Sequence, residues 1–310
     1  YGCLEQTVSS VFPQLFLKNL IALTVNEEKR TEKNVISAIN RLKSFQHSNG
    51  GFGYWPQASY ADDWATNYAG HFLLMADLNG FSIPSGMLSK WKEFQRQKAI
   101  SWSYNAGYAN DELVQAYRLY TLALARAPES GAMNRLLEKR DLSPGARWRL
   151  ASAYFLTGKK EISLQLVKGV PVAVKSYNEM GGSFGSDLRD KAMILQTLVQ
   201  LDLRTQANPL AREIMLALGQ NDLRSTQEIS FGLMAVAEYT GYREANGLSA
   251  TVQQGTEAAS SLKSDKPVVV HEVNITPGVK SALAVKNTGK GLLFARLVTS
   301  GIPAPGEGTE

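Results

Sequence analysis

The apolar residues of this chain follow two different periods. From about residue 13 to residue 241 they recur at helical spacing, so that successive stretches each carry a wide apolar stripe on one face. The stretches that predict amphipathic helices are 14–23, 34–45, 64–78, 87–94, 112–125, 146–156, 191–203 and 229–239. Glycine and proline separate them, and Gly80 and Gly241 stand where C-terminal helix caps are common.

One pattern occurs twice within the helical part. Residues 48–78 and residues 179–203 each contain a Gly-Gly turn, a Phe-Gly pair, an acidic segment and then a helix, and residues 222–241 repeat the second half. Repeated helical hairpins that each bury one face must close on their neighbours. The pattern therefore predicts an all-α domain over residues 1–246, built as an α/α toroid of antiparallel helical hairpins.

After about residue 246 the period changes from helical to alternating. Residues 248–254 alternate, and two later stretches, 267–275 and 292–300, are rich in β-branched residues. The sequence VKNTGKG at 285–291 predicts a hairpin turn between strands at 281–285 and 292–298. Residues 247–310 therefore predict a small β segment of three or four strands, which ends in a Pro/Gly-rich linker at 301–310.

Composition and charge narrow the function classes. The chain has 310 residues, of which 44% are hydrophobic, enough for a sizeable core. Its net charge of +5 is mild, and its basic residues are scattered among acids, which is typical of solvated helix faces rather than of a nucleic-acid-binding stripe. No apolar run reaches the roughly 18 residues of a membrane span. The chain begins at Tyr1 without methionine or signal peptide, so we expect an excised fragment.

The opening YGCLEQ contains Cys3, the single cysteine of the chain. A lone cysteine cannot form an internal disulfide or a multi-cysteine metal site, which leaves a buried filler, a nucleophile or half of another covalent bond. Gln6 follows three residues later, across a turn that enters a helix. A thiol and a carboxamide at this spacing can approach each other, and loss of ammonia would join them as an internal thioester. Such an activated acyl group would acylate an amine or a hydroxyl once exposed.

Several motifs in the same order carry a family resemblance. They are GCLEQ at 2–6, Pro13, DDWATNYAGHFL at 62–73, STQEISFGLMAVAEY at 225–239 and the β segment at 247–310. Together they make the chain resemble the thioester-containing domain of bacterial alpha-2-macroglobulins, relatives of the complement thioester proteins, followed by part of a CUB-like domain. Leu4 stands where the animal proteins usually have glycine, and Asn67 replaces an alanine.

The resemblance implies a site and a function. Cys3 and Gln6 would be the thioester partners. Glu5 would be the motif acid, expected to accept backbone N–H bonds at the helix start, although it could equally be an ordinary acid of an N-terminal turn. The family consists of broad-spectrum protease inhibitors rather than enzymes. A protease cleaves a bait region, the molecule rearranges, and the exposed thioester couples to the attacker. Bacterial members are generally periplasmic lipoproteins of the inner membrane, with neighbouring macroglobulin-like domains and often a peptidoglycan synthase as partners. The resemblance implies no cofactor and no metal.

Histidines and aromatic residues refine this picture. Some family members pass the acyl group through a histidine, but residues 95–112, where it should lie, contain none, which favours direct coupling to lysine amines. His47, His71 and His271 are expected to be ordinary surface or core residues. Several aromatic residues occur in loops or beside helix ends. Each of them is expected to be an ordinary core or rim residue, but as a set some of them could shield a thioester from water. Trp102 and Tyr104 are the first candidates, followed by Tyr108, Tyr1, Tyr54 and Trp55.

Rival functions also fit an α/α toroid, which hosts carbohydrate-active enzymes. Asp62 and Asp63 beside Trp64 could supply a carboxylate pair, although adjacent acids ahead of a helix are the usual N-terminal pattern. A cysteine peptidase would pair Cys3 with a histidine. The third alternative is an interaction module in which Cys3 is inert. For the isolated chain we expect a free Cys3 thiol, because part of the family's shield comes from a neighbouring domain.

Overall fold

The computed structural model describes residues 2–108, 110–220, 224–242, 247–274, 280–290 and 293–299. It divides into two compact units, residues 1–242 and residues 243–310, each described here by itself. The predicted boundary at residue 246 falls on 243–246, outside the described residues. The first unit is helical and the second contains an antiparallel sheet, so the predicted fold class is confirmed.

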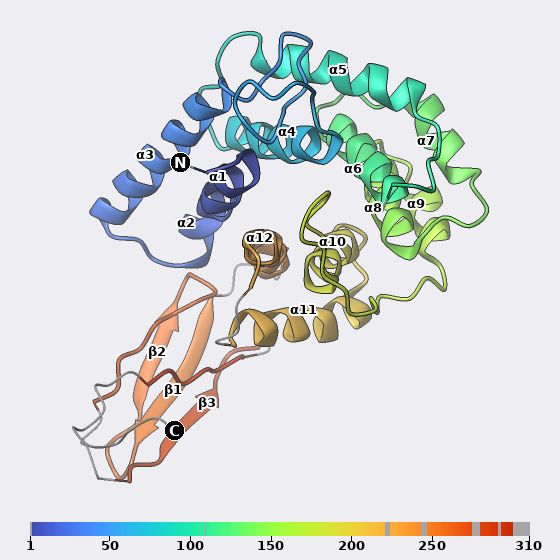
Figure 1. The fold of residues 1–310 in the computed structure, drawn as a ribbon. Helices are drawn as coiled ribbons and strands as arrows, with labels where there is room; N and C mark the ends of the chain where they lie inside the picture. The colour runs from blue at the N-terminus through green and yellow to red at the C-terminus, as the bar shows by residue number, and fades with distance from the viewer. Residues whose placement is uncertain are drawn as a thin grey trace, which may run out of the picture. The chain divides into compact units, whose positions relative to one another are not determined.

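The helices of the first unit form two concentric sets (Figure 1). Their bounds are α1 Leu4–Val11, the 3-10 helix η1 Phe12–Phe16, α2 Leu17–Leu20, α3 Val25–Leu42, α4 Asp63–Leu78, α5 Met87–Ser101, α6 Asp111–Leu124, α7 Ser130–Leu137, α8 Pro144–Leu156, α9 Lys160–Val167, α10 Asp187–Gln200, α11 Arg204–Leu218 and α12 Thr226–Tyr242. The inner helices α1, α4, α6, α8, α10 and α12 each pack against the next, and α12 packs back against α1. Helices α3, α5, α7, α9 and α11 cover this ring from outside. The predicted toroid of paired helices is therefore present.

The repeated sequence pattern produces the same local structure twice. A single β-bridge between Gln46 and Phe52 closes the turn before α4, and a bridge between Asn178 and Ser186 closes the turn before α10. A side-chain oxygen then caps each helix: Asp62 Oδ1 accepts from Ala65 N, and Ser186 Oγ accepts from Arg189 N.

Two predicted helix ends had different outcomes. Gly80 has φ +86°, and the amides of Gly80 and Phe81 donate back to the carbonyls of Asp77 and Ala76, which is a Schellman cap. Gly241 is not a cap, because α12 continues to Tyr242 with Gly241 inside it. The prediction failed there because glycine is tolerated within a helix, at some cost in stability.

The helix predicted over residues 14–23 is wrong at both ends. The helical backbone begins at Phe12 as the 3-10 helix η1, with Pro13 in its first turn, and it ends at Leu20. The reason lies just downstream. Thr24 and Glu27 form a capping box that starts α3, and this cap requires extended backbone at Thr24 (φ −72°, ψ 160°). The outer helices α7, α9 and α11 were not predicted, and the first two are only eight residues long.

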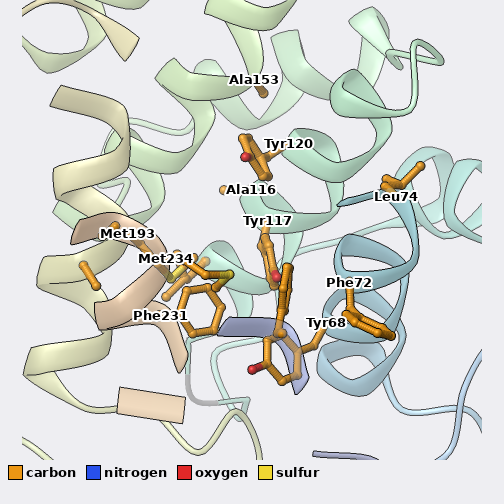
Figure 2. Close-up of a cluster of buried hydrophobic side chains, with 14 of the residues drawn as sticks. Tyr68, Phe72, Leu74, Ala116, Tyr117, Tyr120, Ala153, Met193, Phe231 and Met234 are labelled. Atoms are coloured by element: carbon orange, nitrogen blue, oxygen red, sulfur yellow. The ribbon is translucent and has the colours of Figure 1, made fainter. Parts of the chain in front are cut away.

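Aromatic side chains from the inner helices fill the centre of the first unit. Tyr68, Tyr117 and Phe231 come from α4, α6 and α12 and lie close together, with Met234 beside them (Figure 2). The rings of Tyr68 and Phe231 stack with centroids 5.4 Å apart. Packing of this kind fixes the inner helices that carry the candidate site.

The second unit contains a three-stranded antiparallel sheet. Its strands are β1 Leu248–Gln254, β2 Ser260–Ser264 and β3 Leu283–Asn287, in the order β2-β1-β3. Ala250 pairs with Leu262, and Val252 pairs with Val285. Strand β1 was predicted, and β3 overlaps the strand predicted at 281–285.

Other predictions for this unit were wrong. Residues 267–274 and 293–299 form no strand, so β3 pairs with β1 instead of a following hairpin partner. Strand β2 was missed because its sequence, SSLKS, is polar. The predicted linker at 301–310 lies outside the described residues. Among the residues that the structure describes, no helix is long and apolar enough to cross a membrane.

Candidate functional site

Cys3 and Gln6 bind each other at the start of the first inner helix. Cys3 is the N-cap of α1, with extended backbone (φ −66°, ψ 174°). The amide N–H of Gln6 donates to Cys3 Sγ (3.4 Å), and the amide N–H of Cys3 donates to Gln6 Oε1 (3.2 Å). This is a capping box in which a sulfur replaces the usual hydroxyl oxygen. The thiol and the carboxamide therefore face each other across a single turn.

The residues between them point the other way. Leu4 and Glu5 are buried, whereas Cys3 is half-buried and Gln6 is exposed. The chain is held on both sides of this turn: Leu4 N donates to the carbonyl of Tyr54 (2.8 Å), and Arg41 Nη2 donates to the carbonyl of Gly2 (2.8 Å). Because Leu4 and Glu5 are anchored in the interior, Cys3 and Gln6 lie on the outer side of the first turn of α1.

Glu5 has different partners from those expected. Its Oε1 accepts hydrogen bonds from Ser9 Oγ (2.7 Å) and Thr226 Oγ1 (2.6 Å), not from backbone N–H groups. Two of the first-turn amides are already occupied, since Leu4 N donates to the carbonyl of Tyr54 and Gln6 N donates to the Cys3 sulfur. The carboxylate therefore turns inward and joins α1 to α12.

A chain of hydroxyl groups continues from Ser9 into the core. Ser9 Oγ lies 2.9 Å from Tyr68 OH, and Tyr68 OH donates to Ser230 Oγ (2.8 Å). Burial raises the pKa of Tyr68 well above its ordinary value, so the phenol stays neutral. This chain connects helices α1, α4 and α12 below the motif.

Residues 225–228, with the sequence STQE, lie at the start of α12, and their side chains have different partners. Ser225 and Glu228 cap the helix reciprocally, with Glu228 N donating to Ser225 Oγ (3.1 Å) and Ser225 N donating to Glu228 Oε2 (2.8 Å). Thr226 holds Glu5. With the Gln227 amide assigned in the orientation that satisfies both neighbours, its oxygen accepts from Trp64 Nε1 (3.0 Å) and its nitrogen donates to the carbonyl of Ser183 (3.3 Å). This segment therefore ties α12 to α1, to α4 and to the turn before α10.

Tyr54 is the aromatic residue whose backbone contacts the motif. In addition to accepting from Leu4, it donates its phenol OH to the carbonyl of Gly182 (2.6 Å), and its ring packs edge-on against Phe184 (5.5 Å between centroids). Burial raises the pKa of Tyr54, and the negative charges of the nearby Asp62 and Glu5 carboxylates add to this effect. Tyr54 thus closes a ring of contacts that runs from α1 through residues 182–183 and α12 back to Glu5.

The preferred shielding candidates have other described contacts. Trp102 Nε1 donates to Asp111 Oδ2 (3.1 Å) at the start of α6. Tyr104 lies beneath Lys139 Nζ (4.3 Å) and is 52% exposed, and Tyr108 is 73% exposed. A shielding role for these three residues stays a prediction.

Of the remaining aromatic candidates, Trp55 is also exposed, and Tyr1 lies outside the described residues. Tyr54 was a candidate but not a first choice, because nothing local in FGYWP marks it as the residue that meets the motif.

The histidines take structural positions. His71 is 2% exposed, its Nδ1 lies 2.8 Å from Tyr117 OH, and its ring packs edge-on against Phe12. Burial lowers the pKa of His71 to about 3, so the ring is neutral near neutral pH. His47 lies in the turn before α4, and His271 is exposed in the second unit. Within the described part of the chain, no hydrogen bond joins His47 or His71 to Cys3.

The acidic pair before α4 also has structural partners. Asp62 Oδ1 caps α4, and Asp63 Oδ1 forms an ion pair with Arg118 Nη2 (2.8 Å). These contacts account for both carboxylates without a sugar substrate. In the residues that the structure describes, no cluster of three or more His, Cys, Asp or Glu side chains could hold a metal ion.

The fold and the capping box together define a ring of paired helices with a cysteine–glutamine turn at the start of its first inner helix. No protein-family model matches the chain. The chain is nevertheless homologous to bacterial alpha-2-macroglobulins: it is 30% identical over 331 aligned positions to alpha-2-macroglobulin of Escherichia coli strain K12, which covers 98% of this chain and 19% of the relative. The chain thus spans about a fifth of the length of that relative.

Solved structures support the same relationship. Salmonella alpha-2-macroglobulin reacted with methylamine matches with a TM-score of 0.71 and 27% identity, over 93% of this chain and 19% of the Salmonella chain. Escherichia coli alpha-2-macroglobulin activated by porcine elastase matches with a TM-score of 0.66 and 24% identity, over 93% of this chain and 25% of the other, which shows the shared fold.

Proposed function

We propose that this chain is the thioester domain of a broad-spectrum protease trap of the alpha-2-macroglobulin type. The observation that carries the proposal is the reciprocal bonding of Cys3 and Gln6 at the start of α1. The homologues add support, since the Salmonella protein was reacted with methylamine and the Escherichia coli protein was activated by a protease. In this function the chain inhibits proteases by covalent capture and is not itself an enzyme.

The chemistry has two balanced steps. In the first, the Cys3 sulfur forms a bond to the Gln6 carboxamide carbon, the carbon–nitrogen bond breaks, and the thiol proton leaves with the nitrogen as ammonia. In the second, which follows bait cleavage and rearrangement of the whole protein, an amine of the attacking protease forms an amide bond with the Gln6 acyl group. The carbon–sulfur bond breaks, and a proton from the amine converts the sulfur back to a thiol.

The preferred acceptor is a primary amine such as a lysine side chain. Acyl transfer to hydroxyl groups through a histidine would need an imidazole at Cys3. His71 is instead held in the core by Tyr117, and its lowered pKa reflects that burial. Direct attack by an amine needs no such residue.

The intact protein would act outside the cytoplasm. We place it in the periplasm, anchored to the inner membrane as a lipoprotein, with neighbouring macroglobulin-like domains and a peptidoglycan synthase as partners. The support for this part is the family resemblance alone. Cell fractionation would test the location, and recovery of the intact protein in the cytosolic fraction would contradict it.

The main experiment uses the intact protein that contains this chain. Its mass should be lower than the sequence mass by one ammonia, and labelled methylamine should add to Gln6 while one free thiol appears. Cys3→Ala and Gln6→Asn should abolish both signals. Gln14→Asn is the matched control, because it shortens a half-buried amide side chain of the next helix, η1, which lies outside the motif; its methylamine uptake should equal that of wild type.

Three results would count against the proposal. A full sequence mass with no methylamine uptake would leave Cys3 inert and favour an interaction module. Coupling to glycerol in preference to methylamine would contradict the amine specificity. Cleavage of a polysaccharide by the wild-type chain, lost on mutation of Asp62 or Asp63, would favour the carbohydrate-active alternative.

A further inference from the structure

Thr226, the first residue of α12, reaches across to the motif acid beside the thioester pair. Its Oγ1 donates to Glu5 Oε1 (2.6 Å), although the two residues are 221 positions apart. We propose that Thr226 is a positioning residue: its hydroxyl holds Glu5 in place, and Glu5 holds the first turn of α1 in the geometry that keeps Cys3 and Gln6 together. This inference rests on the proposed function.

Glu5 requires hydrogen-bond donors where it lies. The residue is 5% exposed, and within the described part of the chain it forms no ion pair with a basic side chain. A buried carboxylate is costly unless it is hydrogen-bonded. The hydroxyls of Ser9 and Thr226, both on the same carboxylate oxygen, meet this need. Loss of either hydroxyl therefore weakens the hold on the side chain.

The two donors differ in what they can fix. Ser9 lies in α1 itself, four residues after Glu5, so it moves with the helix, and its contact with Tyr68 anchors the second turn. Thr226 belongs to another helix, and its backbone is fixed by the capping box of Ser225 and Glu228. The Thr226 hydroxyl therefore ties the first turn of α1 to a separate rigid element.

The orientation of the first turn gives this tie a chemical consequence. Glu5 faces inward, while Cys3 and Gln6 face outward on the same turn. Helix ends fray unless they are tied down. When the inward anchor is lost, the turn opens, the distance between the Cys3 sulfur and the Gln6 acyl group becomes variable, and water gains access to the bond. The expected result is lower yield of the thioester and faster hydrolysis.

The test compares three variants in the intact protein. Thr226→Val removes the hydroxyl and keeps the shape, Thr226→Ser keeps the hydroxyl, and Thr205→Val makes the same substitution in the first turn of α11. Thr226 and Thr205 are both exposed, so all three variants should fold, and thermal unfolding checks this. The measurements are methylamine uptake by fresh protein and the half-life of the thioester, followed by the appearance of free thiol.

We expect the half-life to fall about tenfold in Thr226→Val and to stay within about twofold of wild type in the two other variants, as suits loss of one hydrogen bond to a charged group. Hydrogen exchange should also be faster in residues 4–11 of Thr226→Val, with the inner helices α6 and α8 unchanged. A wild-type half-life in Thr226→Ser would show that the hydroxyl group, and not a general effect of substitution at this site on stability, protects the thioester.

The outcomes are distinguishable. If wild type takes up methylamine and Thr226→Val has the wild-type half-life, the positioning role is wrong while the proposed function stands. If Thr226→Ser is as labile as Thr226→Val, the methyl group rather than the hydroxyl matters, and the inference is again wrong. If wild type itself takes up no methylamine, the proposed function fails, and the inference fails with it. Should Thr226→Val unfold, Thr226→Ala replaces it, with the same expected result.

Discussion

Replacement of Gly70 by alanine should destabilise the toroid, because the Trp91 side chain of α5 packs directly against α4 at this residue. A Cβ atom at Gly70 would lie 2.0 Å from Cε2 and 2.1 Å from Nε1 of Trp91. Trp91 is completely buried and cannot swing into solvent, and its Nε1 donates to the carbonyl of Thr66 (2.9 Å). The added methyl group must therefore displace the indole ring, the helix, or both.

The size of the effect follows from three contributions. Overpacking of a well-filled core costs about 1–3 kcal/mol. Displacement of the Trp91 indole leaves a buried N–H without its acceptor, which costs about 1–3 kcal/mol more. Alanine is the better helix former by about 1 kcal/mol, which offsets part of the loss. The net loss is about 3 kcal/mol, or a fall in Tm of roughly 6–12 °C for a unit of this size.

The assay is denaturant and thermal unfolding followed by far-ultraviolet circular dichroism. Gly241→Ala is the matched control, since Gly241 also lies inside an inner helix, but an added Cβ there would meet no atom within 4 Å. This variant should gain about 0.5–1 kcal/mol. A second background, Trp91→Leu, removes most of the indole, so the further change Gly70→Ala should cost much less there than in wild type.

Two results would refute this account. A Gly70→Ala protein as stable as wild type would show that α4 and α5 can separate at little cost. An equal loss in the wild-type and Trp91→Leu backgrounds would show that the indole is not the obstacle, because residues that clash directly must give a coupled double-mutant cycle.

Three further predictions concern titration and the motif. Burial raises the pKa of Glu238 from 4.5 to about 7, so the free energy of unfolding should fall as the pH rises from 4.5 to 7. The variant Glu238→Gln can still accept the hydrogen bond from Gln196, and above pH 7 it should be more stable than wild type by at most about 3 kcal/mol. Denaturant unfolding that shows no gain for this variant would contradict the prediction. Burial lowers the pKa of His71 from 6.5 to about 3, so this residue should lower the free energy of unfolding as the pH falls from 6.5 to 3. In an NMR titration its ring resonances should not shift near pH 6.5. Cys3→Ala should abolish covalent coupling to amines. Thermal unfolding should show that it lowers the free energy of unfolding by less than a large-to-small substitution in the core, which costs about 2–5 kcal/mol.

The features that the sequence determined are local ones. Apolar residues at helical spacing marked the inner helices α4, α6, α8, α10 and α12, because these helices each bury a long apolar stripe. The Cys3–Gln6 pair was also readable, since a spacing of three residues at a helix start brings the two side chains together in any fold that forms that helix.

Elements without a clear local apolar pattern were not predicted. The short outer helices α7 and α9 bury only three residues each, too few for a clear period. Strand β2 has a polar sequence and exists because β1 pairs with it. Gly241 resembled a cap, yet α12 continues past it.

Only the tertiary structure decided what surrounds the motif. Thr226 meets Glu5 across 221 residues and Tyr54 meets Gly182 across 128, and no local pattern predicts either contact. The Thr226 contact arises because the ring of inner helices closes and brings α12 back beside α1, and the Tyr54 contact arises because the same ring brings the turn before α10 to the turn before α4. The partners of the motif acid therefore depend on how the last inner helix packs against the first, a property of the whole ring that no single segment carries.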